Sequence, residues 1–326
     1  MASDVITQNS GQDSKETKRA LKKKMRKERN KKMIQNWQLY IFVLPAFLYF
    51  LIFHYVPMYG LQIAFKDFLP GLGIWGSEWV GFEHFMRFFD SYYFWDLMWN
   101  TLGLSLYELI VGFPLPIILA LALNEAKNGL FKKSVQTVTY APHFISVVVM
   151  GGMIIAFLSP TTGIVNHFIQ MLGFEPIPFM TDPKWFKTVY VFSGVWQSTG
   201  WGTIIYLAAL SGVDPQQHEA ALVDGATRFQ RIWYITLPAI VPTMVILLIM
   251  NVGNIMAMGF EKILLLQNPL NLESSNVIAT FVYEAGLLEG QYSFAAAVGL
   301  FNAIINVILL VAVNAIARKT SETSLW

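Results

Sequence analysis

The feature that most constrains this chain is the recurrence of long, nearly uncharged apolar runs. Only 13% of its 326 residues are charged and 55% are hydrophobic, whereas a soluble globular protein carries about 25% charged residues. A run of about eighteen such residues is long enough to cross the hydrocarbon core of a bilayer as a helix. The composition therefore predicts an all-α integral membrane protein. It excludes an ordinary soluble enzyme, a disordered chain and a nucleic-acid binder.

Six stretches are long and apolar enough to be membrane spans, with edges set to within a few residues. We place them at 39–56, 97–123, 138–158, 189–210, 241–258 and 294–317. Pro114 and Pro116 fall inside the second stretch, where they predict a kink or a break. We therefore expect a six-helix transmembrane domain over residues 37–317, with an ordered, aromatic-rich outer loop at 57–96.

The basic residues are divided very unevenly between the two sides that these spans define. Eighteen of the 23 Lys and Arg lie on the side that holds both chain ends, and 11 of them lie between Lys15 and Lys32. Basic loops stay in the cytoplasm, so we predict a basic cytoplasmic tail at 1–36 and a second cytoplasmic tail at 318–326. The remaining five, on the outer side, are Lys66, Arg87, Lys184, Lys187 and Lys262.

The basic N-terminal tail has two interpretations. Its cluster Lys22-Lys23-Lys24 resembles a nucleic-acid-binding patch. Anionic membrane lipid and the need to set the orientation account for the same charges without nucleic acid, and we prefer that explanation.

One cytoplasmic segment, 211–238, differs from the rest of the chain. Asp214 is a good N-cap, and Pro215 suits the first position of a helix. Gly225 permits the left-handed turn that ends such a helix. We expect two short helices beside the membrane, the second over 226–234.

The same segment carries the signature E-A-A-x3-G-x9-I-x-L-P of the permease subunits of ABC importers. The matching residues are Glu219, Ala220, Ala221, Gly225, Ile235, Leu237 and Pro238. The resemblance covers about residues 37–317 and implies the type I permease fold with both termini in the cytoplasm.

Other motifs resemble the branch of that family that imports oligosaccharides and polysaccharides, alginate and rhamnogalacturonan among them. They lie at 53–60, 64–67, 73–77, 136–137 and 141–146. This branch implies a translocated oligo- or polysaccharide, alginate or another uronate-type sugar included, and leaves the individual sugar open.

The resemblance also implies partners. A coupling helix around Glu219–Gly225 would sit in a cleft of a separate ATP-binding subunit, two of which would serve two permease subunits, this chain and a related one. An extracytoplasmic sugar-binding protein would deliver the substrate. The chain has no G-x-x-x-x-G-K-[ST] segment, so we expect ATP and Mg²⁺ to be used by the partner ATPase. We expect no cofactor, no catalytic residue and no metal site in this chain, which would be a multi-pass protein of the bacterial cytoplasmic membrane.

Polar side chains inside the spans are the candidates for the substrate path, because such groups usually face a cavity or another helix. Each is also compatible with a purely structural role between helices. The candidates are Glu108, Trp196, Gln197, Trp201, Tyr206, Asn251, Asn254, Asn302 and Asn306.

Two other functions remain open. A secondary sugar transporter driven by an ion gradient would favour paired acidic residues in the membrane or a charged filter, and Glu108 is nearly alone in the spans. A membrane anchor without a substrate path would favour uniformly apolar spans, and the polar candidates count against it.

Overall fold

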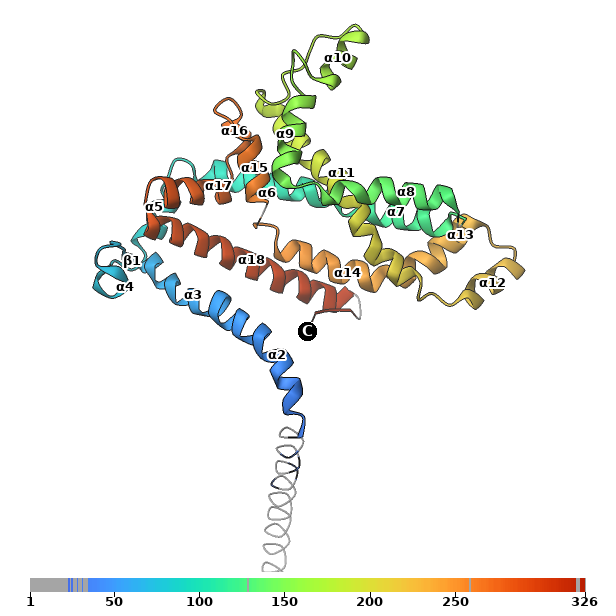
Figure 1. Ribbon diagram of the computed structural model, residues 1–326, viewed down its shortest axis with the longest axis horizontal. Helices are drawn as coiled ribbons and strands as arrows, with labels where there is room; N and C mark the ends of the chain where they lie inside the picture. The colour runs from blue at the N-terminus through green and yellow to red at the C-terminus, as the bar shows by residue number, and fades with distance from the viewer. Residues whose placement is uncertain are drawn as a thin grey trace, which may run out of the picture. The chain divides into compact units, whose positions relative to one another are not determined.

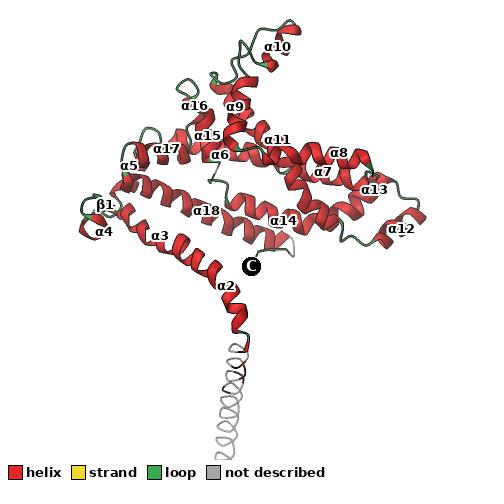
Figure 2. Ribbon diagram, in the orientation of Figure 1, coloured by secondary structure: helices red, strands yellow, loops and turns green. Residues whose placement is uncertain are grey.

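The computed structural model describes residues 23, 25, 28, 31, 35–127, 129–257, 259–320 and 323–325. Most of the predicted basic tail at 1–36 therefore lies outside the described residues. The chain divides into two compact units, residues 1–62 and 63–326, which are considered separately. Figure 2 shows that helices make up most of the described chain, as the composition predicts.

A long apolar helix lies in the first unit except for its last three residues, 63–65, and includes the first predicted span. Its successive parts are α2 (Trp37–Phe50), a π-helical turn η1 (Leu51–Tyr55), α3 (Val56–Met58) and a 3-10 turn η2 (Tyr59–Phe65). The helix covers 29 residues, and its most apolar window has no buried side chain. So much exposed apolar surface is stable only in lipid or against another protein.

The second unit begins with the segment predicted as the outer loop, which is ordered. Its elements are β1 (Lys66–Asp67), α4 (Gly73–Gly76), β2 (Glu78–Trp79) and α5 (Glu83–Phe89). The two strands pair antiparallel, with Lys66 opposite Trp79. The Lys66 ammonium donates to the Ile74 carbonyl at 2.7 Å, and the Phe65 and Trp79 rings stack.

The second predicted span is a nearly continuous helix. It consists of α6 (Phe94–Gly112) and α7 (Pro114–Glu125), which together form a helix of 32 residues. Phe113, between them, keeps helical dihedrals, with φ −71° and ψ −42°. Pro114 takes the first position of α7, where a missing amide costs least, so the predicted break is reduced to this single residue.

The third predicted span, 138–158, is not one continuous helix. The segment is made of α8 (Leu130–Tyr140), the 3-10 turn η3 (Ala141–Phe144) and α9 (Val147–Phe157), and the chain bends there by 103°. Ile145 and Ser146 are extended, and the Ser146 hydroxyl caps α9 by accepting from the Val149 amide at 3.3 Å. Pro142 and a strong N-cap four residues later favour this restart.

Helix α11 (Pro183–Leu210) lies at the centre of the second unit and follows α10 (Ile164–Met171). It packs against α6, α7, α8 and α14, as Figure 1 shows. A cluster of buried side chains, including Leu104, Met150, Phe186 and Ile263, surrounds its first half.

The cytoplasmic loop and the fifth span differ from expectation. After α12 (Pro215–Val223), the helical turns α13 (Arg228–Arg231), η4 (Ile232–Thr236) and α14 (Leu237–Gly253) form one helix of 26 residues. The predicted separate helix over 226–234 is therefore wrong, because these residues begin the fifth span. A capping box between Thr227 and Gln230 starts the helix. The π-helical turn η4 precedes Pro238, which lacks the amide of a regular turn.

The fifth span ends at Gly253 rather than at Met258, which lies outside the described residues. The chain is unwound over the described part of 254–259. The remaining elements are α15 (Phe260–Leu266), α16 (Leu272–Ser275), α17 (Ile278–Tyr283), the π-helical turn η5 (Glu284–Leu288) and α18 (Tyr292–Thr320). Helix α18 runs beside α14 (Figure 1).

Among the described residues, four helices are long and apolar enough to cross a membrane, or five if the bent pair at α8–α9 counts as one span. These four are the predicted first, second, fifth and sixth spans. Helix α11, where the fourth is predicted, has 28 residues but is less apolar. The count of six spans stays a prediction.

The close packing of α11 against α8 at Gly200 can be tested by substitution. A Cβ at Gly200 would overlap the main chain of Thr139 and Tyr140, and rigid backbone cannot move aside cheaply. We expect Gly200→Ala to destabilise the protein by about 1–3 kcal/mol or more, seen as a lower melting temperature in detergent. Gly152→Ala in α9, which has open space around its Cβ, is the control. A wild-type melting temperature for Gly200→Ala would refute this close approach.

Candidate functional site

The predicted coupling loop begins and ends as its residues indicate. The Asp214 carboxylate accepts from the Gln216 amide at 2.9 Å, and Pro215 occupies the first helical position of α12. Gly225 has φ +78°, the left-handed conformation that glycine adopts without strain. The Ala226 amide then bonds back to the Ala221 carbonyl at 2.8 Å, closing the end of the helix.

Helix α12 has no buried residue, and Val223 is 89% exposed. A nine-residue helix gains little stability by itself, and this one presents its apolar side chains to the surroundings. It is therefore a surface suited to contact with another protein.

The structure divides the signature residues between two helices. Glu219, Ala220 and Ala221 lie on α12, whereas Ile235, Leu237 and Pro238 belong to the helix of the fifth span. Ala221, Gly225 and Ile235 line one small groove between them, of about 380 Å³. Glu219 lines another, of about 350 Å³, with His218 and Thr236. The signature residues thus lie on both sides of the turn that connects α12 to the helix of the fifth span.

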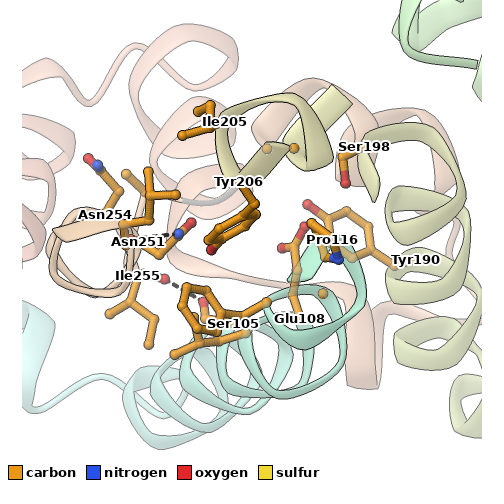
Figure 3. A pocket seen from close by; sticks show the side chains of 17 residues that line it. Ser105, Glu108, Pro116, Tyr190, Ser198, Ile205, Tyr206, Asn251, Asn254 and Ile255 are labelled. Atoms are coloured by element: carbon orange, nitrogen blue, oxygen red, sulfur yellow. Dashed lines mark hydrogen bonds between the residues drawn. The ribbon is translucent and has the colours of Figure 1, made fainter. Parts of the chain in front are cut away.

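A cavity of about 470 Å³ lies among α6, α7, α11, α14 and the unwound segment that follows α14. Figure 3 shows the side chains that line it. Its polar and aromatic lining residues are Ser105, Glu108, Phe113, Tyr190, Ser198, Tyr206, Asn251 and Asn254. Four of the nine predicted path residues, Glu108, Tyr206, Asn251 and Asn254, are among them.

The cavity brings together aromatic rings, two amide groups and a carboxylate. In Figure 3 the Tyr206 ring lies between Asn251 and Glu108. The Asn251 amide donates to the Leu247 carbonyl at 2.8 Å, and the Asn254 amide donates to the Met250 carbonyl at 3.0 Å. These bonds fix the amide groups and leave their carbonyl oxygens as acceptors for hydroxyl groups.

Three other predicted path residues lie on α11 away from this cavity. Gln197 donates to the Ile145 carbonyl at 2.8 Å and so satisfies the backbone at the bend before α9. The Trp201 ring stacks on His143, with ring centres 4.4 Å apart. Trp196 is 50% exposed.

Asn302 and Asn306, the two candidates on α18, hold the unwound segment. The Asn302 amide donates to the Met256 carbonyl at 3.0 Å, and the Asn306 side chain accepts from the Met256 amide at 2.9 Å. Ser105 on α6 donates to the Ile255 carbonyl. Backbone that leaves a helix inside a membrane requires such internal partners.

Lys262 is not among the predicted path residues, although it lies directly behind the cavity wall at Tyr190. The sequence predicts that Lys262 lies in an outer loop, but the residue is in α15 and only 8% exposed. Its ammonium donates to the Tyr190 carbonyl at 2.7 Å. The available signal is the apolar run Ile263–Leu266 that follows it, which indicates a buried helix rather than a loop.

A larger cavity of about 860 Å³ lies near α5, the start of α6, and the segment from α16 to α18. Arg87 in its wall donates to the Gln291 side chain at 2.7 Å, and Tyr92, Tyr93 and Trp99 also line it. Within the part of the chain that the structure describes, no three His, Asp or Glu side chains are grouped to hold a metal ion.

The chain is similar to permeases of known transport systems. It is 45% identical to Protein LplB of Bacillus subtilis (strain 168) over 288 residues, which covers 88% of this chain and 91% of that protein. It is 46% identical to the polygalacturonan/rhamnogalacturonan transport system permease protein YteP of the same organism, over 94% of this chain and 95% of that protein.

The fold is similar to that of a chain in the crystal structure of a bacterial alginate ABC transporter in complex with an alginate pentasaccharide-bound periplasmic protein. The TM-score is 0.84 at 42% identity, covering 90% of this chain and 99% of that chain. Residues 112–322 match the family model described as "Binding-protein-dependent transport system inner membrane component". Because that match spans more than half of the chain and the relatives match over most of their length, the chain belongs to the family of binding-protein-dependent transport system inner membrane components.

Proposed function

We propose that this chain is the membrane-spanning subunit of an ATP-driven importer that moves oligo- or polysaccharides across the bacterial cytoplasmic membrane. The observation that carries the proposal is a cavity lined by aromatic, amide and carboxylate side chains between α6, α7, α11 and α14, in a chain similar over most of its length to a polygalacturonan/rhamnogalacturonan permease. Aromatic rings cover the apolar faces of a sugar, and amide and carboxylate groups pair with its hydroxyls.

In this proposal the chain has six spans and both termini are cytoplasmic. Helix α11 supplies the fourth span, and its 28 residues extend about 42 Å at about 1.5 Å per residue, more than a hydrocarbon core requires. The bent pair α8–α9 supplies the third. The basic residues at 127, 132, 133, 228, 231, 318 and 319 then lie on the cytoplasmic side.

Helix α12 is proposed to seat in a cleft of a separate ATP-binding subunit, which uses ATP and Mg²⁺. Its exposed apolar residues and its rigid caps support this role, since a force applied to α12 passes across one turn into the 26-residue helix of the fifth span. Closure of two ATPase subunits would rock this chain and a second, related permease as rigid bodies. Such coupling requires that nucleotide and sugar bind the two states with different affinity.

An extracytoplasmic sugar-binding protein is proposed to deliver the substrate at the segment 57–96 and the neighbouring cavity of about 860 Å³. The similarity to a chain crystallised with a pentasaccharide-bound periplasmic protein supports this partner. Because two of the similar proteins carry the names of acidic polysaccharides, a uronate-containing sugar is the substrate that we propose.

The test is ATP hydrolysis by the reconstituted assembly of two permeases, ATPase and binding protein, screened across oligosaccharides. We expect a sugar-loaded binding protein to stimulate hydrolysis. Flat hydrolysis, together with sugar uptake driven by an ion gradient alone, would instead establish a secondary transporter.

Glu219→Lys tests the coupling role. A reversed charge on the surface that meets the ATPase should prevent docking, because like-charge contacts cost several kcal/mol. We expect ATP-dependent uptake to fall at least about a hundredfold, while the amount of inserted permease is unchanged. Glu125→Lys at the end of α7 is the control with the same change of charge. Full substrate-stimulated hydrolysis by Glu219→Lys, or by a bulky replacement of Ala221, would contradict the assignment.

Asn251→Ala tests the cavity. Losing one hydrogen bond to a sugar hydroxyl costs about 1 kcal/mol, so we expect the apparent KM for uptake to rise about fivefold with an unchanged amount of protein. Asn254→Ala should behave alike. Val307→Ala, on the exposed face of α18, is the control. Unchanged uptake kinetics in both Asn variants would remove these residues from the path.

A further inference from the structure

A buried lysine lies directly behind the wall of the cavity. Lys262 is in the first turn of α15 and is 8% exposed. Its ammonium donates to the Tyr190 carbonyl at 2.7 Å and lies 4.5 Å from the centre of the Tyr190 ring. Tyr190 itself lines the cavity, so a single side chain separates the positive charge from the space inside.

Glu108 carries the opposite charge, and its carboxylate lies near the same residue of α11, Gly194, as the Lys262 ammonium. A Cβ built at Gly194 of α11 would lie 3.1 Å from the Lys262 Nζ and 3.6 Å from the Glu108 Oε1. Opposite charges this close to the same point attract each other. Because Gly194 has no side chain, the two charges approach each other past α11, and each offsets the cost of burying the other.

The two charges are not equally exposed to a solute in the cavity. Glu108 lines the cavity, whereas Lys262 does not. Without its counter-charge, the carboxylate would repel any anion entering the space, because like charges repel and a site between helices screens them less than bulk water does. The ammonium behind Tyr190 removes that repulsion while the carboxylate still accepts hydrogen bonds from hydroxyl groups.

We propose that Lys262 is a specificity-determining residue, which neutralises Glu108 so that this chain's half of the path admits oligosaccharides that carry carboxylates. The inference rests on the proposed function as an importer of uronate-containing sugars and assigns a residue of this chain to that selectivity. Lys262 does not touch the sugar. It acts through Glu108, whose negative charge it compensates.

The experiment measures uptake by the reconstituted assembly of two sugars that differ only in charge, an oligogalacturonate and its methyl-esterified form. The readout is the ratio of the two initial rates, and of the two dissociation constants measured on the detergent-solubilised assembly. Since both sugars meet the same binding protein, its preference cancels when each variant is compared with the wild type.

Lys262→Met removes the positive charge and keeps the length of the side chain. We expect the charged-to-esterified ratio to fall about tenfold, the effect of one uncompensated charge about 10 Å away in a partly hydrated site. Lys262→Arg should keep the ratio. Glu108→Gln with Lys262→Met should restore it, because the wall is then neutral again.

Two further variants keep the test decisive. Lys187→Met is the matched control, because Lys187 is a partly buried lysine of α11 that approaches Gly103 and lines no part of the cavity. Glu108→Gln alone should raise the charged-to-esterified ratio, because it removes the negative charge from the cavity wall. This variant tests the inference even if Lys262→Met fails to assemble.

An unchanged ratio in Lys262→Met and Glu108→Gln, or a double variant that behaves like Lys262→Met, would overturn the inference while leaving the importer intact. Failure of the wild-type assembly to take up either sugar with ATP would instead refute the proposed function.

Discussion

The fold depends on a constraint set by the bilayer: every backbone group that leaves a regular helix needs a partner inside the protein. Two of the helix interruptions in the described part of the second unit lie before α9 and after α14. Gln197 reaches the first of these, and Asn302 and Asn306 hold the second from both sides of Met256. These side chains satisfy irregular backbone, and the second interruption supplies Ile255, Ala257 and Gly259 to the cavity wall.

Because of this constraint, a polar residue in a span does not by itself indicate a substrate contact. A polar group in an apolar helix indicates a local need for hydrogen bonding, which a sugar, a neighbouring helix or a broken turn can each satisfy. Here Asn251 and Asn254 line the cavity, whereas Asn302 and Asn306 stabilise the loop that forms one of its walls. The second group therefore serves the cavity by shaping it.

Helix α11 connects the interruptions to the charged groups. Its glycines let neighbouring atoms approach closely, the main chain of Thr139 at Gly200 and the pair of Glu108 and Lys262 at Gly194. One helix therefore contacts both the backbone before α9 and the charged pair beside the cavity. A four-residue turn, 211–214, connects α11 to α12, so the helix that lines the cavity is also the one that precedes the coupling loop.

The amino-acid sequence is enough to predict the membrane class, the positions of four apolar helices, and the caps and glycine turn of α12, because these follow from composition and from local backbone preferences. It also identified the family, through a motif confined to one loop. The packing of the folded chain was needed to establish that residues 228–234 continue into the fifth span, that the third span bends by 103°, and that Lys262 is buried beside Tyr190. Local signals accompany each outcome, namely the cap at Thr227, the cap at Ser146 and the apolar run after Lys262. They do not decide it, because whether a helix continues, bends or becomes buried depends on contacts between segments far apart in the chain.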